Sequence, residues 1–379
     1  MRRLPLATYV LSLAAVTAGL VDPSAQEARR VLAVPDIPGY VTLKGDFHLH
    51  SVFSDGEVWP TVHVREAWRD GLDVVALTEH IEYQPHRAHV SGGPGAAYDV
   101  ARPLADKLGL LLVPGAEITR PVPGAPADIP VGSAHFNVLF AADVDALATP
   151  ALDEALERAR AQGAFVFWDH PGFMDGPARW YPHVESLYTA RLFGGIEVVN
   201  GDRFYPEALE WARDRSLTVI AASDAHQPMP AHLKSARRPV TLLFAKARTL
   251  DGVKDALMAR RTVAWLDTHV WGDAALLRSL WKASVSVEPI TVTPGAVVLE
   301  MTNRSSIDFD VEVVESPGWL ALQGATLARD RSTRVTAQVS REAPAGGHLT
   351  QLRVRVKNLQ SAGGAPLEDI LELALTVTP

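Results

Sequence analysis

The stretch "GDFHLHSVFSDG", residues 45–56, places two histidines at the end of an apolar run. Alternating residues of a strand point to opposite sides, so His48 and His50, two positions apart, face the same way. Asp55 follows in a Ser-Asp-Gly sequence of the kind that also forms turns. The stretch is therefore either a strand that carries two imidazoles or the first part of a metal site. The rest of the chain has to supply the other ligands.

Length and composition describe an ordinary globular protein. The chain has 379 residues, which favours two domains because single cores usually stop growing near ~250–300 residues. Its hydrophobic content of 47% and charged content of 21% are typical of soluble proteins. The net charge of −8 and the absence of a long Lys/Arg run argue against stable nucleic-acid binding or attachment to an anionic membrane surface.

The N-terminus has the pattern of a secretory signal. A positive start, "MRR", precedes the uncharged apolar residues 4–21 and a polar exit, "DPSAQEARR". We expect a signal peptide over about residues 1–28, and hence an exported protein of the periplasm or the extracellular space. A single membrane anchor is the alternative, because the run approaches the length of the shortest spanning helices. Pro5 and the small residues favour the signal, after whose cleavage no membrane span is expected.

The sequence contains no cysteine. Lipoprotein anchoring, disulfides, thiol nucleophiles and thiolate ligands are thereby excluded. Any metal has to be held by nitrogen and oxygen donors.

Residues 44–266 alternate short apolar runs with helical patterns. Two of the helical patterns, 60–71 and 150–163, begin at Pro and end at Gly. Apolar strands that alternate with amphipathic helices predict an α/β fold with parallel strands, either a barrel or an open doubly wound sheet, and their number favours the barrel. The expected strands are 44–50, 73–80, 110–119, 133–141, 164–171, 195–201, 217–226, 240–246 and 262–266.

The pattern changes after about residue 283. Several Val- and Thr-rich runs with period-two alternation, separated by turn residues, predict an antiparallel β-sandwich of the immunoglobulin-like kind. We therefore expect a barrel domain over residues 36–282 and a sandwich over 283–379, with the amphipathic stretch 272–284 at the connection. The sandwich contains no catalytic cluster and offers a surface for oligomer formation.

Nine donors fall at corresponding strand ends of the barrel region. Enzymes of this architecture place their chemistry at the carboxyl ends of the strands, so these side chains should converge. Nine nitrogen and oxygen donors exceed the needs of one ion and suit two or three Zn, Mn or Fe ions bridged by a carboxylate. Taken singly, each has another explanation: a core histidine, a salt-bridging Glu117 or a turn at Asp55. The donors are His48, His50, Asp55, His80, Glu117, His135, His170, Asp224 and His226.

The order of these motifs resembles the PHP (polymerase and histidinol phosphatase) domain family. The matching segments are "DFHLHSVFSDG", "ALTEH", "GAEI", "HFNVL", "DHP" and "SDAH", over about residues 44–266. The resemblance implies a distorted seven-stranded (β/α) barrel, a metal centre of up to three ions and hydrolysis of phosphate esters. Position by position, it implies that His48, His50, Glu117 and Asp224 hold a first ion, that Glu117, His135 and His170 hold a second, and that Asp55, His80 and His226 hold a third.

Two further residues are candidates for the chemistry. Asp224 is placed to orient a water or to accept its proton, and Arg203, in "NGDRFYP", to contact a phosphate, with Arg179 as second choice. A loop salt bridge is the other reading of Arg203. His63, on an amphipathic helix, is expected to be a surface or packing residue.

The donor set predicts a metal site, and the resemblance implies that it serves a metal-dependent phosphoesterase acting on a small phosphorylated molecule or a nucleotide. A hydrolase of C–N or C–O bonds, as in amidohydrolase-like barrels, is the first alternative. Those enzymes often use a carbamylated lysine as the bridge, whereas this chain has Glu117 there. A catalytically silent binding protein of the cell envelope is the second alternative.

Overall fold

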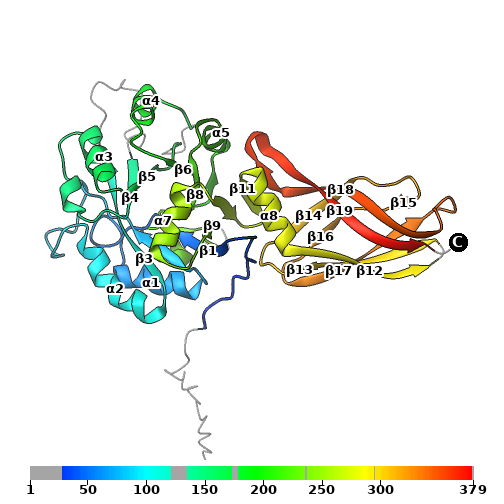
Figure 1. The fold of residues 1–379 in the computed structure, drawn as a ribbon. Helices are drawn as coiled ribbons and strands as arrows, with labels where there is room; N and C mark the ends of the chain where they lie inside the picture. Colours follow the sequence, from blue (N-terminus) through cyan, green and yellow to red (C-terminus); the bar gives the residue numbers. More distant parts are fainter. Residues whose placement is uncertain (1–27, 121–134, 173–177, 235–236, 294, 378–379) are drawn as a thin grey trace, which may run out of the picture.

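A computed structural model describes residues 28–120, 135–172, 178–234, 237–293 and 295–377. A rounded N-terminal body holds the elements from β1 to β10, and an elongated β-rich body lies beside it (Figure 1). The signal segment expected over residues 1–28 lies outside the described residues except for its last position. Within the part of the chain that the structure describes, no helix combines the length and hydropathy needed to cross a membrane.

The N-terminal body is built around one curved sheet. Its strands follow the order β8-β6-β5-β4-β3-β2-β1-β9-β10. Parallel pairs join β1, β2 and β3, and likewise β5, β6 and β8. The strands are β1 (Val41–Asp46), β2 (Val74–Leu77), β3 (Leu111–Thr119), β4 (His135–Leu139), β5 (Phe165–Trp168), β6 (Gly195–Asn200), β7 (Arg203–Phe204), β8 (Thr218–Ala222), β9 (Val240–Ala245) and β10 (Thr262–Leu266).

Strand β4 departs from the expectation of parallel strands, because it runs antiparallel to both β3 and β5. A parallel neighbour needs a crossover connection of a dozen or more residues, usually an α-helix, whereas an antiparallel neighbour does not. A reversed strand presents its first residue at the rim where its neighbours end. His135, which begins β4, therefore pairs with Thr119, the last residue of β3. Strands β9 and β10 are also antiparallel to their neighbours.

The sheet wraps round until β8 approaches β1 and β9. No ladder joins these strands among the described residues, but an isolated parallel bridge links Leu49 to Ala225. The hydroxyl of Thr241 in β9 donates to the carbonyl of Ala221 in β8 and accepts from its N–H. One bridge and side-chain hydrogen bonds thus form the seam of a distorted barrel, which confirms the predicted fold class.

Helices cover the outside and one end of this barrel. Val253, Ala256 and Leu257 of α7 belong to the buried cluster that also contains Phe47 and Phe167 from inside the sheet. Thr218, the first residue of β8, donates to the Leu257 carbonyl, so α7 closes the end at which the parallel strands begin. The helices are α1 (Pro60–Arg69), α2 (Ala96–Leu108), α3 (Leu152–Ala161), α4 (Pro182–Thr189), α5 (Pro206–Arg215), α6 (Met229–His232) and α7 (Leu250–Met258), with a 3-10 turn, η2 (Asp145–Leu147).

The C-terminal body consists of two antiparallel sheets that share a buried apolar core. One sheet has the order β12-β13-β17-β15, and the other contains β16, β14, β18 and β19. Period-two burial along β13 follows the predicted alternation. The strands are β12 (Val285–Thr293), β13 (Ala296–Asn303), β14 (Phe309–Glu315), β15 (Leu320–Ala321), β16 (Ala325–Leu327), β17 (Arg331–Val339), β18 (Gly346–Ser361) and β19 (Ala365–Val377), with η4 (Ala362–Gly364) between the last two.

Main-chain pairing joins the two bodies. Strand β11 (His269–Gly272) pairs antiparallel with β10 and parallel with β18, so the barrel sheet continues into the C-terminal body (Figure 1). The indole of Trp271 donates to the Gln360 side chain at 3.1 Å and stacks on Phe204 with ring centroids 4.2 Å apart. Helix α8 (Ala274–Ser284), capped by the Asp273 carboxylate, connects β11 to β12.

Candidate metal centre

The predicted donors converge at the rim opposite α7. His48 and His50 follow β1, and the parallel bridge between His80 and Glu117 extends the pairing of β2 and β3 to this rim. Asp224 and His226 follow β8 and lie beside the His50 segment, because the His50 N–H donates to the Ala225 carbonyl. All nine predicted donors belong to three groups in which the ligand atoms lie within 4.8 Å of one another.

The first group has the geometry of ligands around one ion. The Nε2 atoms of His48 and His50 are 3.0 Å apart. Glu117 Oε2 lies 2.9 and 3.0 Å from them, and Asp224 Oδ1 lies 3.2 Å from each. Neighbouring donors bound to one ion at ~2.0–2.2 Å are themselves roughly 3 Å apart. These four residues therefore have the spacing expected of donors around one divalent ion.

The second group shares Glu117 with the first. Its other oxygen, Oε1, contacts His135 Nδ1 and lies 3.9 Å from His170 Nε2. The side chain is 1% exposed, so this carboxylate is almost wholly enclosed by imidazoles. A carboxylate with one oxygen facing each of two donor groups is suited to bridging two ions.

The third group surrounds Asp55. Its Oδ1 lies 3.3 Å from His226 Nε2, and its Oδ2 lies 3.7 Å from His80 Nε2. The rings of His80 and His226 both stack against the ring of His50, with centroids 4.5 and 4.3 Å apart. The structure thus brings Asp55 to the centre, although its sequence also fits a simple turn.

Charge in the centre is balanced by unusual protonation. Burial alone would lower the pKa of both His48 and His50, but the carboxylates of Asp224 and Glu117 raise the pKa of His50 to about 10 and that of His48 well above its ordinary value. Burial would raise the pKa of Glu117 and Asp224, yet the imidazoles hold both well below the usual range. The imidazoles of His48 and His50 therefore bind protons, because the neighbouring carboxylates favour positive charge there. A divalent ion can replace them, so metal binding should release protons and weaken as pH falls.

Buried residues that the sequence analysis did not select orient His48. Glu197 accepts a hydrogen bond from His48 Nδ1 at 2.8 Å, so Nε2 is the ring nitrogen that faces the first group and can bind an ion once its proton is displaced. The other Glu197 oxygen accepts from the His170 N–H at 2.7 Å and from Asn200 at 2.9 Å. Asp169 lies close to His48 and Glu197, and burial raises the pKa of Asp169 well above the ordinary value. Glu197 interrupts the apolar strand "GIEVVNG", and a carboxylate in a buried strand was the signal available.

A second buried carboxylate, Glu79, orders the loop that carries Asp55. It accepts hydrogen bonds from the Ser51 N–H and hydroxyl and, at 2.6 Å, from the Ser54 hydroxyl. Ser54 in turn lies 3.4 Å from His50 Nδ1. The Ser-Asp-Gly turn is therefore tied to the end of β2.

The main chain is strained at two of the candidate ligands. His170 and Asp224 have positive φ angles of 24° and 54°. Non-glycine residues rarely adopt this region, and such strain is maintained where the surroundings hold a side chain in a functional orientation.

His63 supports the centre rather than facing solvent. It is fully buried on α1, and its Nε2 donates to the His50 carbonyl at 2.8 Å. The expectation of a packing residue is met, and that of a surface residue is wrong. Burial lowers the pKa of His63 to about 3, so the ring is neutral in the folded protein.

Replacing His63 by Gln should make the free energy of unfolding depend less on pH below neutrality. The pKa of His63 in the folded protein lies below the unfolded value of ~6.5. The contribution of His63 to the free energy of unfolding is therefore complete above pH ~6.5 and is lost as pH falls. We expect the free energy of unfolding of metal-free wild type to fall between pH 7.5 and 5 by about 2 kcal/mol more than that of His63→Gln. Urea unfolding at both pH values measures this, with the exposed His89→Gln as control. Equal losses in wild type and His63→Gln would contradict the assignment.

Arg203 lies at the edge of the rim. Its guanidinium donates to the Gly172 carbonyl at 2.8 Å, two residues after His170, and lies 4.9 Å from the centre of the Tyr205 ring. Strand β7, which carries Arg203, pairs with the end of β6. The structure thus places Arg203 beside the segment that carries His170 of the second group.

A barrel-like α/β domain with nitrogen and oxygen donors gathered at one rim is the architecture of a metal-dependent hydrolase. A two-domain protein from Bacteroides vulgatus, which contains a predicted PHP-like metal-dependent phosphoesterase, has a solved structure that is 37% identical to this chain. The match covers 91% of this chain and 99% of that one, with a TM-score of 0.83. This chain belongs to the family of PHP-like metal-dependent phosphoesterases.

Two more distant structures match part of the chain. One, from Bifidobacterium adolescentis and proposed to be a metal-dependent phosphoesterase, is 18% identical over 57% of this chain and 96% of its own, with a TM-score of 0.40. The lesion-specific endonuclease PfuEndoQ from Pyrococcus furiosus is 16% identical over 61% of this chain and 59% of its own, with a TM-score of 0.37. At these values neither adds to the assignment. No model of a protein family and no curated protein matches the sequence.

Proposed function

We propose that this protein hydrolyses phosphate esters of small molecules or nucleotides at a centre of two or three Zn, Mn or Fe ions. The observation that carries the proposal is Glu117, whose two oxygens face two separate sets of imidazoles in a buried site. The family membership supports the same reaction. Divalent ions held there would supply a bound water of lowered pKa and positive charge for the phosphoryl oxygens.

The residues of the chain have separate tasks in this reaction. Asp224 is the candidate proton acceptor, because it is ionised and its Oδ2 is fixed by a hydrogen bond from Asn200 at 3.3 Å. Glu197 accepts from His48 Nδ1 and so directs the Nε2 atom toward the ion that would replace its proton. Arg203, held near His170 by its bond to the Gly172 carbonyl, is the candidate to contact a phosphate.

The remaining assignments are part of the same proposal. An exported protein meets phosphate esters outside the cytoplasm, which suits a scavenging role and a small phosphorylated substrate. Nucleic acid is not expected to be a stable partner, since the net charge is −8. The C-terminal β domain offers the surface for any oligomer.

A substrate panel tests the proposed reaction. The full chain is freed of metal by chelation, reloaded with Mn, Zn or Fe, and assayed on 4-nitrophenyl phosphate, its diester, a nucleoside monophosphate and a 4-nitroanilide amide. We expect phosphate-ester turnover that depends on the added metal and is lost in His48→Ala. The partly buried His348→Ala, in the β domain and outside the three donor groups, is the matched control.

The other outcomes identify the alternatives. Turnover of the amide without any phosphate ester would favour a C–N hydrolase. Absence of bound metal and of turnover after reloading would favour the silent binding protein.

A further inference from the structure

Asp46, the last residue of β1, is a fully buried carboxylate that has no task in the proposed reaction. Its Oδ1 accepts a hydrogen bond from the Ser223 N–H at 3.0 Å, and its Oδ2 accepts from the Ser223 hydroxyl at 2.6 Å. The same Oδ2 also accepts from a guanidinium nitrogen of Arg238 at 3.2 Å. Two segments that are 177 and 192 residues away in the chain thus meet at one carboxylate.

These contacts lie at the seam of the barrel. Ser223 directly follows β8, and Arg238 lies two residues before β9, which begins near the end of β1 because the two strands are antiparallel. No ladder joins β8 to β1 within the part of the chain that the structure describes. The distance between the ends of β1 and β8 therefore depends on side-chain contacts, and Asp46 supplies those nearest to the metal centre.

Ser223 directly precedes Asp224, whose main chain has the strained φ of 54°. All the polar groups of Ser223 have partners: its N–H and hydroxyl donate to Asp46, and its carbonyl accepts from His232 Nε2 at 2.9 Å. On the other side of Asp224, the Ala225 carbonyl accepts from the main chain of the segment that follows β1. A left-handed conformation of a residue other than glycine persists where its surroundings hold it, and here both neighbours are held.

The direction of the Asp224 side chain matters for the first donor group. Its Oδ1 lies 3.2 Å from the Nε2 atoms of both His48 and His50. Because an aspartate side chain is short, the place of its carboxylate follows the main chain closely. A change in the main chain at Ser223 would therefore move this oxygen away from the two imidazoles.

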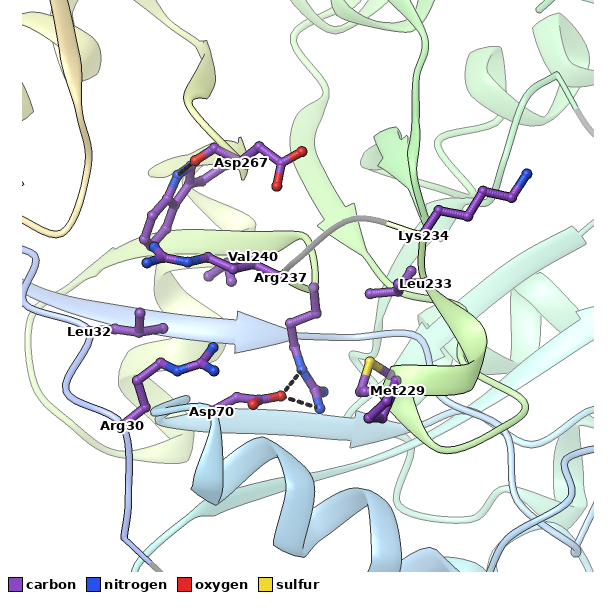
Figure 2. A pocket seen from close by; sticks show the side chains of 12 residues that line it. Arg30, Leu32, Asp70, Met229, Leu233, Lys234, Arg237, Val240 and Asp267 are labelled. Carbon is purple, nitrogen blue, oxygen red and sulfur yellow. Dashed lines mark hydrogen bonds and ion pairs between the residues drawn. The ribbon is translucent and has the colours of Figure 1, made fainter. Parts of the chain in front are cut away.

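Arg238 joins Asp46 to a second carboxylate. Its side chain is 2% exposed, and its NH2 and Nε atoms lie 2.9 and 3.0 Å from Oδ2 of Asp70, at the end of α1. Figure 2 marks this pairing by dashed lines at Asp70, in the wall of a cavity on the flank of the barrel. Removal of a partner from a buried ion pair is costly when it leaves a charge without compensation. Arg238 keeps one carboxylate when the other is made neutral, so each can be changed separately.

We propose that Asp46 is a positioning residue of the metal centre. By holding Ser223 it fixes the strained main chain of Asp224, so that the Asp224 carboxylate faces the two imidazoles of the first group. Asp46 contacts neither an ion nor a substrate in this role. The inference rests on the proposed function only in taking Asp224 as a ligand, and it does not depend on which bond is hydrolysed.

Zinc affinity of the full chain tests this role without any turnover. The chelated protein is titrated with Zn²⁺ in competition with a chromophoric chelator of known affinity. We expect Asp46→Asn to raise the dissociation constant of one bound ion by about 10–100-fold, the usual cost of losing a group that orients a ligand. At saturating metal, kcat for a phosphate monoester should fall and KM should stay unchanged, because Asp46 does not touch the substrate.

Ser223→Ala is a second variant, which decides the question if Asp46→Asn does not fold. It removes the hydroxyl contact and keeps both the main-chain hydrogen bond and every charge. We expect the dissociation constant of one ion to rise by about two- to tenfold, the range that corresponds to one hydrogen bond. Circular dichroism and the melting temperature of the metal-free proteins show which variants are folded.

Asp70→Asn is the matched control, because it removes the other carboxylate of Arg238 and changes the net charge equally. It leaves the contacts between Asp46 and Ser223 in place, so wild-type zinc affinity and kcat are expected. Unchanged zinc affinity in both Asp46→Asn and Ser223→Ala would overturn the inference. An equal loss in Asp70→Asn would overturn it as well, since the ion pairs would then act through overall stability. Weakened zinc binding in Asp46→Asn beside a wild type that hydrolyses no phosphate ester would refute the proposed reaction and support the positioning role.

Discussion

Glu117→Gln is expected to remove most of the bound metal and to lower kcat/KM for a phosphate monoester by about 10³-fold or more. The amide retains the size of the side chain but loses the charge and one of the two oxygens that face separate donor groups. Ions stabilise the transition state by several kcal/mol, and each 1.36 kcal/mol is a factor of ten in rate. Metal content by elemental analysis and steady-state kinetics on the same preparation measure both effects.

Glu154→Gln is the matched control for this change. Glu154 lies on the exposed face of α3 and pairs with Arg158 one turn away, an interaction worth roughly 0.3–0.5 kcal/mol. It should keep full metal content and activity. A Glu117→Gln protein with wild-type metal content and rate would refute the bridging role and, with it, the strongest support for a multinuclear centre.

Asp224→Asn should lower kcat by about 10²–10⁴-fold, the usual contribution of a positioned general base. Asparagine tolerates the left-handed backbone conformation that Asp224 adopts at φ 54°, so the variant changes charge with little change of shape. The loss should fall on kcat more than on KM, because the proposed role is in proton transfer. Kinetics at saturating metal distinguish this loss from weaker metal binding.

Asp330→Asn is the control for the backbone. Asp330 also has a positive φ, 53°, but lies exposed in the β domain. We expect unchanged activity and stability for this variant. If Asp224→Asn raised KM and left kcat unchanged, Asp224 would contribute to substrate binding and would not be the proton acceptor.

The candidate ligands at the rim could be predicted because the ends of apolar strands can be recognised in the sequence alone. His48, His50 and His80 each follow an apolar run, and parallel strands bring such positions to one edge. His135 was expected at the rim for an incomplete reason: it begins a reversed strand instead of ending a parallel one. The direction of β4 depends on pairing with β3, which no local pattern specifies.

The supporting layer could not be predicted in the same way. Glu197 and Glu79 act through hydrogen bonds to residues 149 and 28 positions away in the chain. Pairings of this kind arise only when the sheet has folded. His63 likewise has a function because α1 packs its imidazole against the His50 carbonyl, and an amphipathic helix does not reveal which polar group its buried histidine meets. The residues of the centre could therefore be predicted from the sequence, whereas their orientation could not.

The pairing of β11 with β18 joins the two bodies in one continuous sheet. Val270 and Trp271 pair with Leu359 and Gln360, so removal of the β domain would leave an unpaired strand at the edge of the barrel sheet. Such an edge invites pairing with another chain. Its C-terminal domain covers this edge of the barrel sheet, so we expect the isolated barrel to aggregate more readily than the full chain.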